Sequence, residues 1–159
     1  MKTSKQLALD DTDLEILDQL QHNCKQSIAE LAERVLLSVS ACHRRIKALE
    51  EAGVVIGYVA KMSAQKLGYR VEFFVELSLS SQGEEAFKKF EKAVLQIPEV
   101  LECYLVGGQY DYLLRIIARD TEDYERIHRE SISRLPGVTR IQSILSLRTV
   151  KSHYGFPVR

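Results

Sequence analysis

The sequence predicts an α+β protein of two small domains, and two observations carry that prediction. In the first sixty residues apolar side chains recur every three or four positions, the period of an amphipathic helix. From Val71 the period changes to two, which is the spacing of a strand with one buried face. The chain has 159 residues, enough for two small domains. We therefore divide it into residues 1–60, a hinge at 61–70 that holds a single glycine, and residues 71–159.

Three helices are expected in the first domain. Asp10 is placed to cap the first helix, and Ser27 with Glu30 forms the capping-box pattern at the start of the second. Ser38 is the N-cap expected for the third, which ends at Gly53, a residue free to take the left-handed conformation. The apolar positions expected to face inward are Leu14, Ile16, Leu17 and Leu20, then Ile28, Leu31, Ala32 and Val35, then Val39, Cys42, Ile46 and Leu49.

The face of the third helix opposite its apolar stripe is polar and cationic. Two helices joined by a four-residue turn, the second with such a face, form a helix-turn-helix that can enter the DNA major groove. A solvated helix face is the alternative interpretation. Arg45 lies at the border of the two faces, where it can pair with a phosphate or with an acid of its own domain. The residues expected to contact DNA are Ser38, Ser40, His43, Arg44, Arg45 and Lys47.

The apolar run Val54–Ala60 after these helices is expected to form a short strand or wing, which completes a winged helix-turn-helix. The balance of basic and acidic residues limits how strongly such a domain can bind DNA. The chain has 22 basic and 22 acidic residues, and up to Met62 there are eight basic against nine acidic ones. A single copy would bind DNA weakly, so we expect two recognition helices to act together on one duplex.

The second domain shows the order strand, helix, strand, strand, helix, strand. A repeat supports it, because Ile97-Pro98-Glu99-Val100 and Leu135-Pro136-Gly137-Val138 each end a helix and open a strand. This order is typical of a ferredoxin-like βαββαβ sandwich with both helices on one face of the sheet. The expected ranges are a strand from Val71 to Leu79, a helix from Glu84 to Leu95, strands at Val100–Val106 and Tyr112–Ala118, a helix capped by Asp120 or Thr121 and ending at Pro136-Gly137, and a strand through Ile141 and Ile144 to Leu147.

The central strands between Val100 and Ala118 are apolar on both faces in this prediction. A sheet with helices on one side only would leave such a face uncovered. We therefore expect a second sheet to pack against it, most simply from another copy of the chain.

Both halves resemble the Lrp/AsnC family of bacterial and archaeal transcription regulators. Leu9–Ala60 is similar to the family's DNA-binding half, and LSVSACHRRIKALEEAG resembles its recognition-helix signature, with Val39 where the family usually has proline. Val71 to about Lys151 resembles its ligand-sensing RAM domain, and Gly108-Gln109-Tyr110-Asp111 looks like its G-x-Y-D turn. The resemblance implies that this turn lies where dimers meet, near the pocket for an amino-acid effector.

Chemistry supports that use of the turn. Adjacent glycines can bring backbone N–H groups close to a ligand carboxylate, and Asp111 can hold the ammonium group. The alternative is a plain hairpin turn in which the glycines take positive φ and Asp111 caps the turn. The expected effector contacts are Leu105, Val106, Gly107, Gly108, Gln109, Tyr110, Asp111 and Leu145.

Catalysis and metal binding find no support in the sequence. Histidines 22, 43, 128 and 153 lack metal-ligand spacing, and cysteines 24, 42 and 103 form no C-x-x-C pair and are expected to be reduced. The alternative that this chain is an enzyme, such as the sirohaem decarboxylases, which resemble this family, has only fold analogy in its support. We expect no catalytic residue, metal or cofactor.

The N-terminus lacks the apolar stretch of a signal peptide, and no segment approaches membrane-spanning length. We therefore expect a cytoplasmic protein without a membrane partner. The function expected is a transcription regulator that binds double-stranded DNA as a homodimer, assembles to a tetramer or octamer, and responds to a small amino acid. A nucleoid-organising protein that wraps DNA without effector control remains open at this stage.

Overall fold

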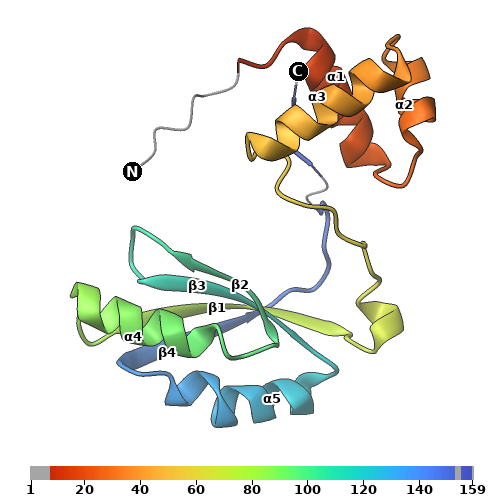
Figure 1. Ribbon diagram of the computed structural model, residues 1–159. Helices are drawn as coiled ribbons and strands as arrows, with labels where there is room; N and C mark the ends of the chain where they lie inside the picture. The colour runs from red at the N-terminus through yellow and green to blue at the C-terminus, as the bar shows by residue number, and fades with distance from the viewer. Residues whose placement is uncertain (1–7, 153–154, 159) are drawn as a thin grey trace. The chain divides into compact units, whose positions relative to one another are not determined.

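The computed structural model describes residues 8–152 and 155–158, and the chain forms two compact units. The first runs up to Lys61 and also takes in the chain from Lys151 onward, and the second is Met62–Val150. Figure 1 shows helices in the first unit and a sheet with helices in the second. Most of the expected hinge thus belongs to the second unit and contains a 3-10 turn, η1 (Gln65–Leu67). The end of the chain, expected in the second domain, packs with the first unit.

The first unit contains α1 (Asp11–His22), α2 (Ile28–Arg34) and α3 (Val39–Glu51). Their N-caps are the predicted residues Asp10, Ser27 and Ser38, and α1 and α2 both have complete capping boxes. α3 ends as expected before Gly53, which has φ +71°. The buried core of this unit consists of Ile16, Leu17, Leu31, Ala32, Val35, Cys42 and Leu49.

Two residues predicted to face inward do not. Ile28 is 37% exposed and Val39 is 52% exposed. Each is the first residue of its helix, and helical side chains lean toward the N-terminus of their own helix. The side chain of a first residue therefore points past the helix end, where no turn of its own helix lies beneath it.

Of the short strand or wing expected at Val54–Ala60, the strand does not form. The segment is without strand pairing, and the side chains of Ile56 and Val59 are 96% and 87% exposed. A strand needs a neighbour to satisfy its backbone groups. The described part of this unit contains no other strand, so the apolar run has nothing to pair with.

The second unit is built on the four-stranded antiparallel sheet of the predicted ferredoxin-like sandwich, and its strand order is β2-β3-β1-β4. β2 and β4 end one and two residues earlier than expected. The strands are β1 (Val71–Leu79), β2 (Val100–Leu105), β3 (Tyr112–Ala118) and β4 (Val138–Leu145).

Two helices, α4 (Glu84–Val94) and α5 (Thr121–Glu130), cover one face of the sheet. Asp120 caps α5 by accepting the N–H of Asp123. α5 stops at Glu130 and gives way to a 3-10 turn, η2 (Ile132–Arg134), so the helix does not continue to the proline. Alternate residues of β1 and β3 form one core with both helices, and both central strands show the strict burial alternation of a one-sided sheet.

The other face of the sheet is less apolar than predicted. Phe74, Leu113 and Ile117 are half-buried on it. Between them, Arg115 forms ion pairs with Glu72 and, at 2.9 Å, with Glu102. The face is therefore mixed, with an ion-paired centre among apolar side chains.

Candidate nucleic-acid interface and ligand pocket

The turn between α2 and α3 is fixed by backbone hydrogen bonds. Leu36 has φ +54°, and among the described residues it is the one non-glycine residue with a positive φ. The next N–H, of Leu37, donates to the Ala32 carbonyl at 2.9 Å, which ends α2 in a Schellman arrangement. Ser38, an expected DNA contact, is exposed and caps α3 by accepting the Ala41 N–H at 3.2 Å. This tight turn sets the position of α3 against α2.

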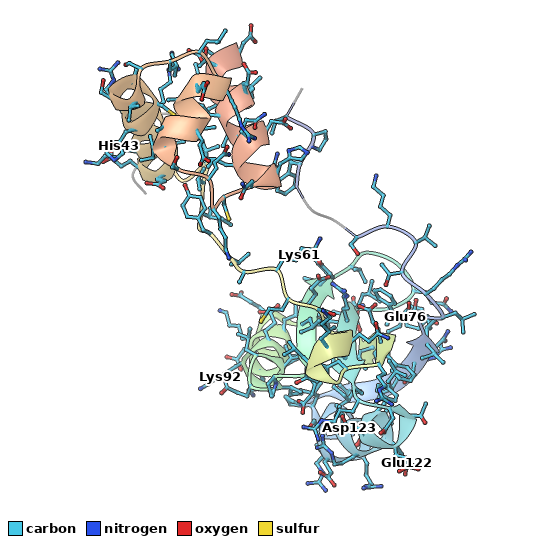
Figure 2. All side chains as sticks on the ribbon, turned by 90° about the vertical axis from the view of Figure 1, so that its right-hand side faces the viewer. His43, Lys61, Glu76, Lys92, Glu122 and Asp123 are labelled. Carbon is cyan, nitrogen blue, oxygen red and sulfur yellow. The ribbon has the colours of Figure 1, made fainter. Side chains whose placement is uncertain are left out.

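The outer face of α3 carries four of the expected contacts, Ser40, His43, Arg44 and Lys47, and all are exposed. Figure 2 shows His43 on the outer surface of the first unit. Within the described parts of the chain the side chains of His43 and Arg44 have no hydrogen-bond or ion-pair partner. Lys47 Nζ lies 3.6 Å from Glu51 Oε1 in an exposed pair, which contributes little and can be exchanged for another anion.

Arg45 has a different environment from the rest of the set. Its Nη1 donates to Asp13 Oδ1 at 2.7 Å and to Asp10 Oδ2 at 2.8 Å. The bonds to Asp13 and then Asp10 raise the pKa of Arg45. The pKa of Asp10 is lowered, first by the Asp13 backbone N–H and then by Arg45. Of the two partners considered, a phosphate or an acid of its own domain, the structure shows the acids. Arg45 joins α3 to the start of α1.

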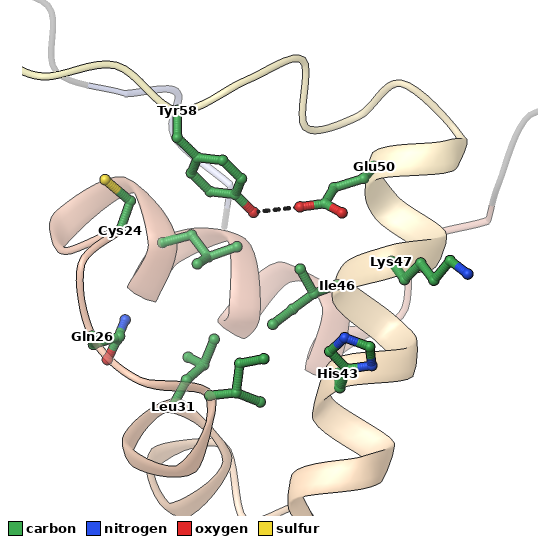
Figure 3. Close-up of a pocket in the computed structure, with 10 residues that line it drawn as sticks. Cys24, Gln26, Leu31, His43, Ile46, Lys47, Glu50 and Tyr58 are labelled. Atoms are coloured by element: carbon green, nitrogen blue, oxygen red, sulfur yellow. Dashed lines mark hydrogen bonds between the residues drawn. The ribbon is translucent and has the colours of Figure 1, made fainter.

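A pocket of about 440 Å³ opens beside α3 (Figure 3). The Tyr58 hydroxyl donates to Glu50 Oε1 at 2.8 Å across it. Burial and then this bond raise the pKa of Tyr58 to about 12. No sequence pattern signals this pocket, because the reversal of the chain after Gly53 brings Tyr58 back to α3. Its lining consists of Leu20, Cys24, Gln26, Ile28, Leu31, His43, Ile46, Lys47, Glu50 and Tyr58.

A second pocket, of about 540 Å³, lies at the turn between β2 and β3. Six of the eight predicted effector residues line it: Leu105, Val106, Gly107, Gly108, Tyr110 and Asp111. Gln82 and Phe87 also line it, and sequence reasoning missed both because they come from the loop after β1 and from α4. Gln109 does not line it. Leu145 lies on β4, at the opposite edge of the sheet from β2, so it does not reach this pocket within one chain.

Asp111 is buried in the wall of this pocket and holds the turn in place. Its Oδ2 accepts the Leu79 N–H at 2.7 Å, and its Oδ1 accepts Gln82 Nε2 at 2.8 Å. Its backbone N–H donates to the Leu77 carbonyl, and its carbonyl accepts the Val106 N–H, both at 2.9 Å. The Asp111 carboxylate therefore ties the β2–β3 turn to the end of β1 and to the loop that follows β1. All its side-chain partners are neutral, so the buried negative charge is not balanced by a cation in the described residues.

The backbone of the turn is open toward a ligand. In the described structure the N–H groups of residues 107–110 donate no hydrogen bond to the protein. Gly108 has φ +148°, a conformation that favours glycine. The hydroxyl of Tyr110 donates to Gln142 Oε1 at 2.8 Å, and Arg140 lies over its ring at 5.4 Å. Tyr110 therefore connects the pocket to the open face of the sheet.

Metal-ligating side chains and cysteine thiols were the other candidates for a chemical site. No group of three or more metal-ligating side chains occurs in the described ranges, and His153 lies outside them. Burial raises the pKa of the Cys42 thiol and raises that of Cys103 to about 11, so both resist ionisation. None of the helices described has the length and apolar character needed to span a bilayer.

Comparison with known proteins adds to this geometry. Residues 72–156 match the family model of the Lrp/AsnC ligand binding domain, and residues 9–56 match that of a winged helix-turn-helix DNA-binding domain. A proline dehydrogenase transcriptional activator of Rhizobium radiobacter is 38% identical over 143 residues, 90% of this chain and 92% of the relative. A leucine-responsive regulatory protein of Haemophilus influenzae is 34% identical over 95% of this chain and 91% of its own length. A transcriptional regulator of Neisseria meningitidis solved with L-methionine has a TM-score of 0.90 and 34% identity, covering 95% of this chain and 97% of that one.

Proposed function

This chain belongs to the Lrp/AsnC family of transcriptional regulators, and from that premise we propose how its own residues serve regulation. The outer face of α3 enters the major groove, and the pocket at the β2–β3 turn binds a small amino acid that changes DNA binding. The DNA-binding part of the proposal rests on the different ion-pair partners of two neighbouring arginines. Arg45 is held by two carboxylates, whereas Arg44 is exposed with no ion-pair partner in the described residues.

In this proposal Arg44 is the principal base or phosphate contact, with His43, Lys47 and Ser40 beside it. A guanidinium can bind two acceptors of guanine or a phosphate in one plane. Arg45 acts through position, because its bonds to α1 fix the angle at which α3 is presented. A protein of this class acts on chromosomal DNA, so we place it in the cytoplasm.

The effector proposal follows from the charges of the pocket. The unpaired N–H groups of Gly107, Gly108 and Tyr110 attract a carboxylate, and the unbalanced charge of Asp111 attracts an ammonium group. Phe87, Leu105 and Val106 provide apolar surface for a side chain. An amino acid with an apolar side chain carries all three groups. A regulator of similar fold is solved in complex with L-methionine, an amino acid of this class.

The proposal also includes assembly of several copies, which the open sheet face and the position of Leu145 support. Half-buried Phe74, Leu113 and Ile117 support packing against a second copy, and higher assembly to a tetramer or octamer follows the same family premise. Leu145 is far along the sheet from the pocket of its own chain. If it contacts the effector at all, it does so from another copy.

DNA binding is tested by titrating labelled DNA from upstream of the protein's own gene. Arg44→Ala should cost about 1 to 3 kcal/mol of affinity if Arg44 reads a base. Arg129→Ala, which removes an equal charge from the exposed surface of α5, is the matched control and should bind as the unmodified protein does. Equal affinity for the double variant Arg44→Ala/Lys47→Ala would contradict the assignment. A steep salt dependence with little preference between sites would favour DNA wrapping over operator recognition.

The effector site is tested by thermal shift against the twenty amino acids. A ligand that binds only the folded protein raises its stability with concentration. Gly107→Ala places a methyl group in open space at the pocket wall without a positive φ, so it should weaken binding about tenfold without unfolding the turn. Gln109→Ala, in the same turn but outside the pocket, serves as control. Unchanged binding by Gly107→Ala would place the effector elsewhere.

A further inference from the structure

The end of the chain returns to the DNA-binding unit and is held there by the side chain of one residue. Gln21, near the end of α1, donates from Nε2 to the Phe156 carbonyl at 3.2 Å and accepts the Phe156 N–H on Oε1 at 2.5 Å. The amide thus binds both main-chain groups of one residue, as a neighbouring strand would. In Figure 1 the blue end of the chain lies within the helical unit.

The sequence of this tail suits such binding. Pro157 restricts Phe156 to extended conformations and has no N–H that would be left unpaired. Val158 is half-buried and packs against the helical core. The tail is therefore partly ordered before it docks, which lowers the entropy lost on docking.

Gly155 makes the contact sterically specific. A Cβ added there would lie 2.5 Å from Oε1 and 2.8 Å from Cδ of Gln21. Gln21 is flexible enough to move aside, so a side chain at this position would not break the fold. Moving aside would, however, break both hydrogen bonds to Phe156.

We propose that residues 155–158 act as a docked strap that couples the ligand-binding unit to the DNA-binding unit. The two units are joined by the chain at Lys61–Met62 and again at Val150–Lys151. The second connection starts five residues after the end of β4. With the strap docked, the chain forms a second link from β4 to α1, which ends in the two hydrogen bonds of Gln21, and α1 holds α3 through Arg45. The coupling part of this inference rests on the proposed function, whereas the docking part does not.

Hydrogen exchange of the full-length protein tests the docking. The Phe156 amide should exchange about tenfold or more slowly in the unmodified protein than in Gly155→Ala or Gln21→Ala, because in both variants its acceptor is lost. Phe156→Leu keeps the main chain that Gln21 binds and should retain the protection. Equal exchange in all four proteins would overturn the docking.

DNA titration of the same proteins, with and without the amino acid found by thermal shift, tests the coupling. Gly155→Ala and Gln21→Ala should bind DNA and amino acid as the unmodified protein does, within about twofold. The change in DNA affinity caused by the amino acid should fall by at least half, because one of two connections is released. An unchanged response with lost protection would overturn the coupling. If the unmodified protein binds neither DNA nor an amino acid, the proposed function fails, and the exchange comparison still decides the docking.

Discussion

At the scale of single residues, side-chain type was easier to predict than partner. Arg44 and Arg45 are adjacent and chemically equal in sequence, yet the fold leaves one exposed and gives the other two carboxylates. Asp111 was expected at a ligand site, and it lines a pocket while also capping β1 through Leu79. Because both of its oxygens bind the protein, Asp111→Ala would disturb the turn as well as any ligand. Long-range partners such as these depend on tertiary packing, which a local pattern does not encode.

Leu36 gives a prediction at this scale. Its side chain is 92% exposed, and its φ of +54° is unfavourable for a residue with a Cβ. Leu36→Gly removes that strain and loses no burial, so it should raise the free energy of unfolding by about 0.5 to 1 kcal/mol. Chemical denaturation checks this value. Leu37→Gly, at the half-buried neighbour, should be destabilising, and a loss of stability in Leu36→Gly would show that the turn is not strained.

At the scale of elements, the prediction succeeded where the signals are local. Helix caps join residues three apart, and the alternation along β1 is a property of one strand, so both could be predicted from sequence. The segment 54–60 has the composition of a strand, but pairing requires a neighbour that this unit does not supply. Leu145 lies on β4, at the sheet edge opposite β2, so its predicted effector contact stays a prediction that needs a second copy of the chain.

The contact between α1 and α3 gives a prediction at this scale. Arg45→Ala leaves the largely buried carboxylate of Asp13 without its cation, which should lower the free energy of unfolding by about 1 to 3 kcal/mol. Arg34→Ala, which loses an exposed bond from α2 to Gln19, should cost much less.

The stabilising effect of the contact between Arg45 and Asp10 should depend on pH. Its pKa is lowered from the ordinary 3.8, so its stabilising effect is present above that pH and is lost as the pH falls through the lowered value. The difference between the unmodified protein and Arg45→Ala should therefore shrink below about pH 4. Thermal denaturation between pH 7 and pH 3 measures it, and a difference independent of pH would remove Asp10 from the contact.

At the scale of the whole molecule, function depends on placement of charge and on connection between units. The chain has no net charge, so in the proposed function the cationic face of α3 supplies the attraction to DNA and assembly of several copies multiplies it. The sequence predicted the fold class of both halves, and six of the eight residues it offered as effector contacts line the pocket at the β2–β3 turn. It did not predict that the tail returns to α1, because a single glutamine amide binding a main chain leaves no periodic signal.

The most direct test of the central claim is the salt dependence of DNA affinity for three arginine variants. The slope of log affinity against log salt should become shallower by about one per bound subunit in Arg44→Ala if that guanidinium replaces counterions on a phosphate, whereas loss of a base contact should lower the affinity by about 1 to 3 kcal/mol. Arg45→Ala, whose charge is already balanced within the protein, and Arg129→Ala should keep the slope of the unmodified protein. If Arg44→Ala were indistinguishable from Arg129→Ala in both affinity and slope, the outer face of α3 would not be the DNA-binding surface.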